Sequence, residues 1–169
     1  ARFGIHRIAE FYGSSEGNVA FLNMLNKDCT VGTTSLPLAL VKYNVDADEI
    51  ARDAQGRFIR VADGEPGLLL GKITEHTAFE GYTSSKDTEK KILRDAFEKG
   101  DAWFNTGDLM KTVDVGFSLG LAHYQFVDRV GDTFRWKSEN VSTNEVGEII
   151  NGHAHVDFCN VYGVEIPKA

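Results

Sequence analysis

The sequence predicts an α+β fold in which strands dominate the first part of the chain. Short apolar runs, separated by glycine and other turn-forming residues, recur along most of the 169 residues. A capped helix and a further apolar run follow near the C-terminus. The hydrophobic fraction of 42% and the charged fraction of 25% are typical of an ordinary globular protein.

The apolar runs and the turns between them define the predicted strands. A run that ends at Gly13 is typical of a buried strand leading into a loop. Gln55 and Gly56 form a turn, and residues 63–67 are dense in turn formers. In order, the predicted strands cover residues 8–12, 38–45, 58–61, 68–73, 117–128, 134–136 and 156–166.

The first predicted helix covers residues 86–99. Ile92, Ala96 and Phe97 recur on one of its faces, as expected for a helix with one buried side. Gly100 follows directly and is a typical residue to end a helix.

The second predicted helix runs to residue 150. Ser142 or Thr143 can cap its first turn. Glu145 stands three residues after Ser142, which is the spacing of a capping box. We therefore expect this helix to be fixed by signals within its own sequence.

Composition and charge exclude several classes of function. The net charge of −7 argues against a general nucleic-acid binder, which would carry a basic patch. No apolar run is long enough to span a bilayer. No signal peptide opens the chain, but it begins at Ala1 in mid-pattern, so N-terminal targeting is not indicated either way. Cys29 and Cys159 lie far apart without metal-ligand spacing, so we expect free thiols in a reducing, cytoplasmic compartment.

Residues 12–17 read Tyr-Gly-Ser-Ser-Glu-Gly and combine groups that suit a nucleotide. Tyr12 offers a ring for a purine, and Gly13 lets the backbone approach a ligand closely. Ser15 can donate to a phosphate oxygen, and Glu16 can hold Mg²⁺, a cation that prefers oxygen ligands. The alternative for an isolated match is a polar turn after a buried strand.

An acid and an arginine further along the chain have a matching chemistry. Asp108, in Thr-Gly-Asp, can accept hydrogen bonds from two ribose hydroxyls at once. Arg129 can pair with ribose or phosphate oxygens and keeps its charge at any working pH. The alternatives are a surface turn for Asp108 and an ion pair of Arg129 with Asp128 or Asp132.

These motifs are followed by Asp-Thr-Phe-Arg-Trp-Lys at residues 132–137 and Glu-Asn-Val-Ser-Thr at residues 139–143. In this order they resemble the adenylate-forming (AMP-binding) enzymes, most closely the very-long-chain acyl-CoA synthetases, also called fatty acid transport proteins. The resemblance covers nearly the whole chain. It implies the strand-rich end of a large adenylation domain at residues 1–130, then the incomplete start of a small C-terminal α+β domain at residues 131–169.

The resemblance also implies roles for the residues of the first motifs. Tyr12 would pack on the adenine, Gly13 would belong to the same nucleotide-binding loop, and Ser15 would lie near the α-phosphate. Glu16 would bind Mg²⁺, so Ser15 and Glu16 are the expected catalytic residues. Asp108 would hold the ribose, and Arg129 would contact the nucleotide.

The later motif adds further expected roles. Arg135 and Asn140 would face the nucleotide in one conformation of such an enzyme, or else be ordinary strand or surface residues. Gly131 would be the hinge between the domains, with a hairpin glycine as the alternative. Ser138 stands where the family usually has glycine, on the path of the coenzyme A thiol, so thioester formation is in more doubt than adenylation.

The expected function is that of a fragment of a long- or very-long-chain fatty acid:CoA ligase. Such an enzyme uses ATP and Mg²⁺ to form an acyl-AMP and then transfers the acyl group to coenzyme A. The family's glycine-rich phosphate loop and its C-terminal catalytic lysine are not found in this sequence. The isolated chain is therefore expected to be inactive or nearly so.

Three alternatives remain at the level of sequence. The first is an adenylating ligase for an aryl or bile acid, and the second is a non-catalytic nucleotide-binding or lipid-uptake module. The third is a structural fragment without binding. The expected partners are a fatty acid, ATP and coenzyme A, with peripheral association with a membrane and no nucleic acid; the oligomeric state is not indicated.

Overall fold

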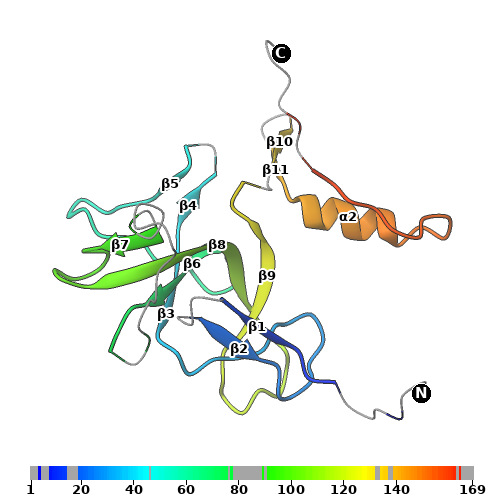
Figure 1. Ribbon diagram of the computed structural model, residues 1–169, viewed down its shortest axis with the longest axis horizontal. Helices are drawn as coiled ribbons and strands as arrows, with labels where there is room; N and C mark the ends of the chain where they lie inside the picture. Colours follow the sequence, from blue (N-terminus) through cyan, green and yellow to red (C-terminus); the bar gives the residue numbers. More distant parts are fainter. Residues whose placement is uncertain are drawn as a thin grey trace.

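The computed structural model describes residues 4, 8–14, 19–45, 47–75, 77, 89, 91–131, 134–136, 139–162 and 164, with only the backbone described for 134–136 and 139–140. This part of the chain contains eleven strands and one helix (Figure 1). They are β1 (Phe11–Gly13), β2 (Ala20–Leu22), β3 (Leu38–Val41), β4 (Tyr43–Asn44), β5 (Glu49–Ile50), β6 (Gly67–Lys72), β7 (Ile92–Arg94), β8 (Ala102–Val113), β9 (His123–Arg129), β10 (Phe134–Trp136), β11 (Glu139–Val141) and α2 (Thr143–Asn151).

The twelve-residue strand β8 organises an antiparallel five-stranded sheet. One edge of β8 pairs with β6, which in turn pairs with β3. The other edge pairs with β7 along residues 102–104 and with β9 along residues 108–113. Two-stranded pairs, β1–β2, β4–β5 and β10–β11, complete the described strands.

Both faces of this sheet are covered, and two cores result. Leu68 and Leu70 of β6 belong to a first core with Trp103 and Leu109, whereas Leu69 belongs to a second core with Met110. Alternate side chains of a strand point to opposite faces, which explains the division. The uninterrupted apolar run of β6 is therefore the mark of a strand buried on both sides.

Several predictions from the sequence are confirmed. The chain has the expected α+β character, with a strand-rich body and one described helix near the C-terminus. Ser142 is the N-cap of α2, and its side chain accepts a hydrogen bond from the Glu145 amide at 3.2 Å. Strand β6 and strand β10 lie where the apolar runs placed them.

No helix in the described residues is long and apolar enough to cross a bilayer.

The prediction of a helix over residues 86–99 is wrong from Ile92 onward, whereas Glu89 and Lys91 are helical as predicted. Ile92–Arg94 form β7, and a turn follows in which Asp101 accepts hydrogen bonds from the amides of Ala96, Phe97 and Glu98. Pairing with the open edge of β8 and packing of Ala96 in the first core outweigh the helical spacing. Residues 86–88 and 90 lie outside the described residues.

Five predicted strands also differ from the structure. The run at 8–12 is not buried, because Ile8 and Phe11 are 71% and 80% exposed. The run at 38–45 breaks after Val41 into β3 and β4, and the run at 58–61 forms only isolated bridges. The run at 117–128 becomes a strand only at His123, and residues 156–162 are irregular.

Candidate functional site

Thr106, Gly107 and Asp108 form a bulge within β8, not a surface turn. Leu68 pairs with Leu109 and Leu70 pairs with Asn105, so these three residues lie opposite the single residue Leu69. Gly107 has φ of +80°, a conformation that favours glycine. The bulge places an acid on a strand that is buried on both sides.

Side chains of the bulge satisfy its own backbone groups. The Thr106 hydroxyl donates to the Leu69 carbonyl at 2.9 Å and accepts from the Asp108 amide at 3.0 Å. The Asn105 side-chain oxygen accepts from the Gly107 amide at 2.9 Å. The Gly107 carbonyl accepts from the Val130 amide at 2.8 Å. A bulge held by four bonds is a fixed support for the Asp108 carboxylate.

Two side chains from distant parts of the chain meet this carboxylate. The Tyr12 phenol donates to Asp108 Oδ2, and Arg129 Nε lies 3.2 Å from Asp108 Oδ1. Asp108 is almost fully buried, whereas the Arg129 side chain is 69% exposed. The buried acid is thus neutralised from the solvent side while Tyr12 orients it from within.

The Tyr12 ring is packed as well as hydrogen-bonded. It meets the ring of Phe21 edge-on, with centroids 5.7 Å apart. Burial, followed by the hydrogen bond to Asp108, raises the pKa of the Tyr12 phenol well above its ordinary value of 10.0. The phenol therefore stays protonated and acts as a donor.

Asp128 does not pair with the Arg129 guanidinium. Its carboxylate is buried and accepts from the amide of Arg129 at 2.9 Å, the amide of Thr143 at 3.1 Å and the side chain of Asn144 at 2.7 Å. It thus joins the end of β9 to the first turn of α2. Of the alternatives for Arg129, Asp128 is excluded by this geometry, and Asp132 lies outside the described residues.

A cavity of about 500 Å³ opens beside the Asp108 carboxylate. Its lining comes from β1, β8, the end of β9 and the segment before β7. The lining residues are Tyr12, Gly13, Ser14, Lys91, Phe104, Thr106, Gly107, Asp108, Arg129 and Val130. Four residues named from the sequence, Tyr12, Gly13, Asp108 and Arg129, are therefore gathered around one space.

The lining also includes residues that sequence reasoning did not select, among them Ser14 and Lys91. The Ser14 hydroxyl is buried and has no hydrogen-bond partner among the described residues. Its place beside Gly13 in the first motif could have pointed to it. Lys91 had no such signal, because it lay in a segment interpreted as an ordinary helix.

The other predicted site residues are only partly located. Ser15, Glu16 and Ser138 lie outside the described residues. Arg135 and Asn140 are register partners in the β10–β11 pair, with only their backbone described. Gly131 directly follows Val130 of the cavity and has φ of +97°. In the described part of the chain, no group of three or more acids, histidines and cysteines could hold a metal ion.

The chain was compared with known proteins by sequence and by structure. No family model matches the chain. The chain is 50% identical over 167 residues to the medium/long-chain-fatty-acid–CoA ligase FadD6 of Mycobacterium tuberculosis, covering 99% of this chain and 27% of that protein. It is 49% identical over 173 residues to the long-chain fatty acid transport protein 2 of Rattus norvegicus, covering 98% and 27%.

Over nearly its whole length the chain is thus similar to a segment of fatty acid–CoA ligases and long-chain fatty acid transport proteins. It spans about a quarter of the length of these relatives. The anthranilate CoA ligase AuaEII, solved in complex with anthranoyl-AMP, has the same fold over 93% of this chain and 26% of its own, with a TM-score of 0.62 and 23% identity. Sequence similarity thus relates the chain to fatty acid ligases and transport proteins, and structural similarity shows the fold.

Proposed function

We propose that this chain is the nucleotide-holding part of a ligase that activates a long-chain fatty acid with ATP and transfers it to coenzyme A. The observation that carries the proposal is the convergence of Tyr12, Asp108 and Arg129 beside one cavity. Sequence identity favours a fatty acid over an aryl or bile acid. The relatives at 49–50% identity are named for fatty acids, whereas the likeness to an anthranilate ligase concerns the fold alone.

Asp108 would hold the ribose of ATP and of the acyl-adenylate. Each carboxylate oxygen can accept more than one hydrogen bond. The bonds to Tyr12 and Arg129 therefore leave capacity on both oxygens for the ribose hydroxyls. Because the carboxylate is fixed by its bulge and by two partners, the nucleotide would be positioned without a further loss of side-chain freedom.

The remaining roles are proposed on the resemblance. Ser15 would donate to the α-phosphate, and Glu16 would hold Mg²⁺, which when bound neutralises phosphate charge. Arg135 and Asn140 would approach the nucleotide from the small domain. That domain would begin at residue 131, with Gly131 as the hinge, and Ser138 would lie on the path of the coenzyme A thiol.

A segment exchange tests the proposal. In the Mycobacterium tuberculosis relative, the matching 167 residues are replaced by this chain, and AMP release is measured with fatty acid, ATP and coenzyme A. We expect the hybrid to release AMP and to form thioester. The isolated 169-residue chain should do neither.

Asp108→Asn in the hybrid should raise the KM for ATP at least about tenfold, because it weakens charge-assisted hydrogen bonds. Asp114→Asn, in an exposed loop, is the matched control. A folded hybrid without AMP release would contradict the ligase proposal and favour the non-catalytic module. AMP release without thioester would point to Ser138.

A further inference from the structure

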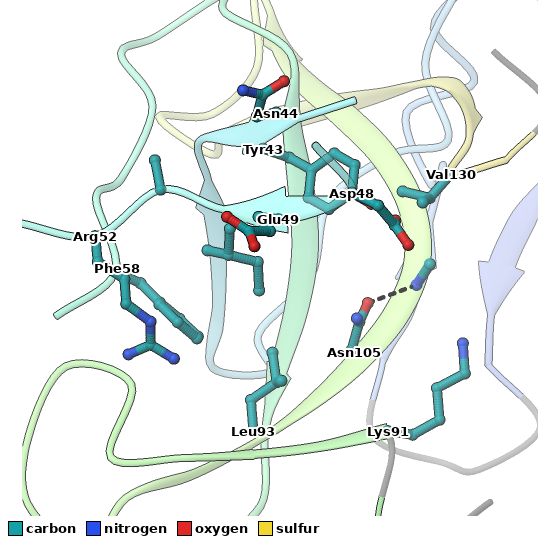
Figure 2. Close-up of a pocket in the computed structure, with 13 residues that line it drawn as sticks. Tyr43, Asn44, Asp48, Glu49, Arg52, Phe58, Lys91, Leu93, Asn105 and Val130 are labelled. Carbon is teal, nitrogen blue, oxygen red and sulfur yellow. Dashed lines mark hydrogen bonds between the residues drawn. The ribbon is translucent and has the colours of Figure 1, made fainter. Parts of the chain in front are cut away.

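A second cavity adjoins the one at Asp108. Its volume is about 820 Å³, and Tyr43, Asp48, Arg52, Phe58 and Asn105 are among its lining residues (Figure 2). Lys91, Gly107 and Val130 line both cavities. The two spaces therefore meet at these three residues, of which Lys91 alone carries a charge.

The absence of a side chain at Gly107 lets Lys91 approach the bulge. The Lys91 ammonium lies 3.4 Å from the point that a Cβ atom on Gly107 would occupy. Figure 2 shows the Lys91 side chain extending along the strand that carries Asn105. This places a half-buried cation beside the residue that precedes Asp108.

Lys91 has no acidic partner in the part of the chain that the structure describes. The ion pairs there join Arg57 to Asp53, Arg94 to Glu89 and Arg129 to Asp108. Among the described residues, the charged ones that line the Asp108 cavity are one acid, Asp108, and two cations, Arg129 and Lys91. The described lining therefore has an excess of one positive charge, in a chain whose net charge is −7.

The second cavity is also lined by two acids, Asp48 and Glu49, and by Arg52, and neither acid forms an ion pair with Lys91. The Tyr43 phenol donates to Asp48. The Arg52 guanidinium lies 4.3 Å from the centre of the Phe58 ring and donates to the Gly56 carbonyl at 2.6 Å. An ammonium left without a counter-charge at a cavity wall is suited to an anionic ligand.

We propose that Lys91 forms an anion subsite at the junction of the two cavities and binds a phosphate of the nucleotide whose ribose Asp108 holds. The inference rests on the proposed function, since it adds a phosphate contact to the same nucleotide. A ligand with a ribose diol and a phosphate matches both groups, because the acid accepts from hydroxyls and the ammonium donates to phosphate oxygens.

Binding of AMP and of adenosine to the 169-residue chain, measured by calorimetry at fixed ionic strength, separates the phosphate contribution from that of the nucleoside. We expect Lys91→Gln to weaken AMP binding about tenfold and to leave adenosine binding unchanged, because only AMP carries the phosphate. Lys91→Arg should retain most of the AMP affinity. The matched control is Lys111→Gln, a half-buried lysine of β8 that lines neither cavity.

The outcomes distinguish this inference from the proposed function. If Asp108→Asn weakens both ligands while Lys91→Gln changes neither, or changes both equally, the subsite is wrong and nucleotide binding stands. If the unchanged chain binds neither AMP nor adenosine, nucleotide binding by this chain and the subsite are both overturned. An unchanged thermal unfolding midpoint of Lys91→Gln excludes loss of folding as the cause.

Discussion

Tyr12 reaches Asp108 across 96 residues of sequence, whereas Ser142 caps α2 through a bond to Glu145, three residues away. The cavity at Asp108 is assembled by sheet pairing and by packing in two cores. Helix α2 is formed by local signals and is joined to β9 through the carboxylate of Asp128. The site thus depends on the whole sheet, whereas the placement of the helix on β9 depends strongly on one side chain.

The largest expected loss in the free energy of unfolding is at Gly32, where the backbone passes close to that of Leu22. A Cβ atom there would lie 2.3 Å from the backbone carbonyl of Leu22, and φ is +103°. We expect Gly32→Ala to lower the free energy of unfolding by about 3 kcal/mol, through overpacking and left-handed strain. Denaturant unfolding measures the loss.

The matched control for Gly32 is Gly56→Ala. Gly56 also has a positive φ, of +80°, but no heavy atom lies within 4 Å of the added Cβ. Only the backbone strain remains, so we expect a loss of about 1 kcal/mol. Equal losses at the two glycines would show that the contact between Gly32 and Leu22 does not hold the site together.

A smaller effect is expected at Asp128, and it should be confined to the helix. Asp128→Asn replaces one carboxylate oxygen by an amide that cannot accept from Thr143 or Asn144. We expect a loss of about 2 kcal/mol, because a buried group loses a charge-assisted bond. Hydrogen exchange should quicken in α2 and stay slow in β6 and β8, and equal quickening in both would contradict the division between the two regions.

The smallest expected effect is that of Tyr12→Phe, and it depends on pH. Near neutral pH the variant loses one hydrogen bond to Asp108, worth about 1.5 kcal/mol. The raised pKa of folded Tyr12 means that the stability contributed by its protonated phenol is complete below pH 10.0. That contribution is lost as the pH rises above this value toward the pKa of the folded state, because the unfolded chain releases the proton first.

Denaturant unfolding of the unchanged chain and of Tyr12→Phe, at a series of alkaline pH values, checks this dependence. The difference in unfolding free energy should shrink above pH 10.0. Other tyrosines titrate alike in both proteins and cancel in the difference. A difference that stays constant with pH would show that Tyr12 is not held protonated by its surroundings.

The sequence was sufficient where the decisive interactions are local. The cap at Ser142 and the apolar run of β6 needed no knowledge of the rest of the chain. The helix prediction failed at Ile92, because that segment pairs with the edge of β8, which comes later in the sequence. The spacing of apolar residues gives no information on whether a segment forms a helix or pairs with a distant strand.

The site was predictable as a set of residues but not as a geometry. The motifs named Tyr12, Asp108 and Arg129 as candidate site residues, and the resemblance ordered them. The bond from the Tyr12 phenol to Asp108 depends on how β1 and β8 lie against the second core, which no local pattern records. Lys91 was missed for the same reason, since its contact is with a glycine sixteen residues later.

The bulge at residues 106–108 also determines where this chain can change in length. Three residues of the bulge lie opposite Leu69. Removing one of them would turn the side chains on one side of the deletion to the opposite face of the sheet. Leu109 and Met110 would exchange cores, or Asp108 would turn away from Tyr12. Residues 114–122 lie beyond the end of β8 in a largely exposed loop, where added residues leave every pair of the sheet intact. Insertions and deletions are therefore expected to be tolerated in that loop and excluded from the bulge.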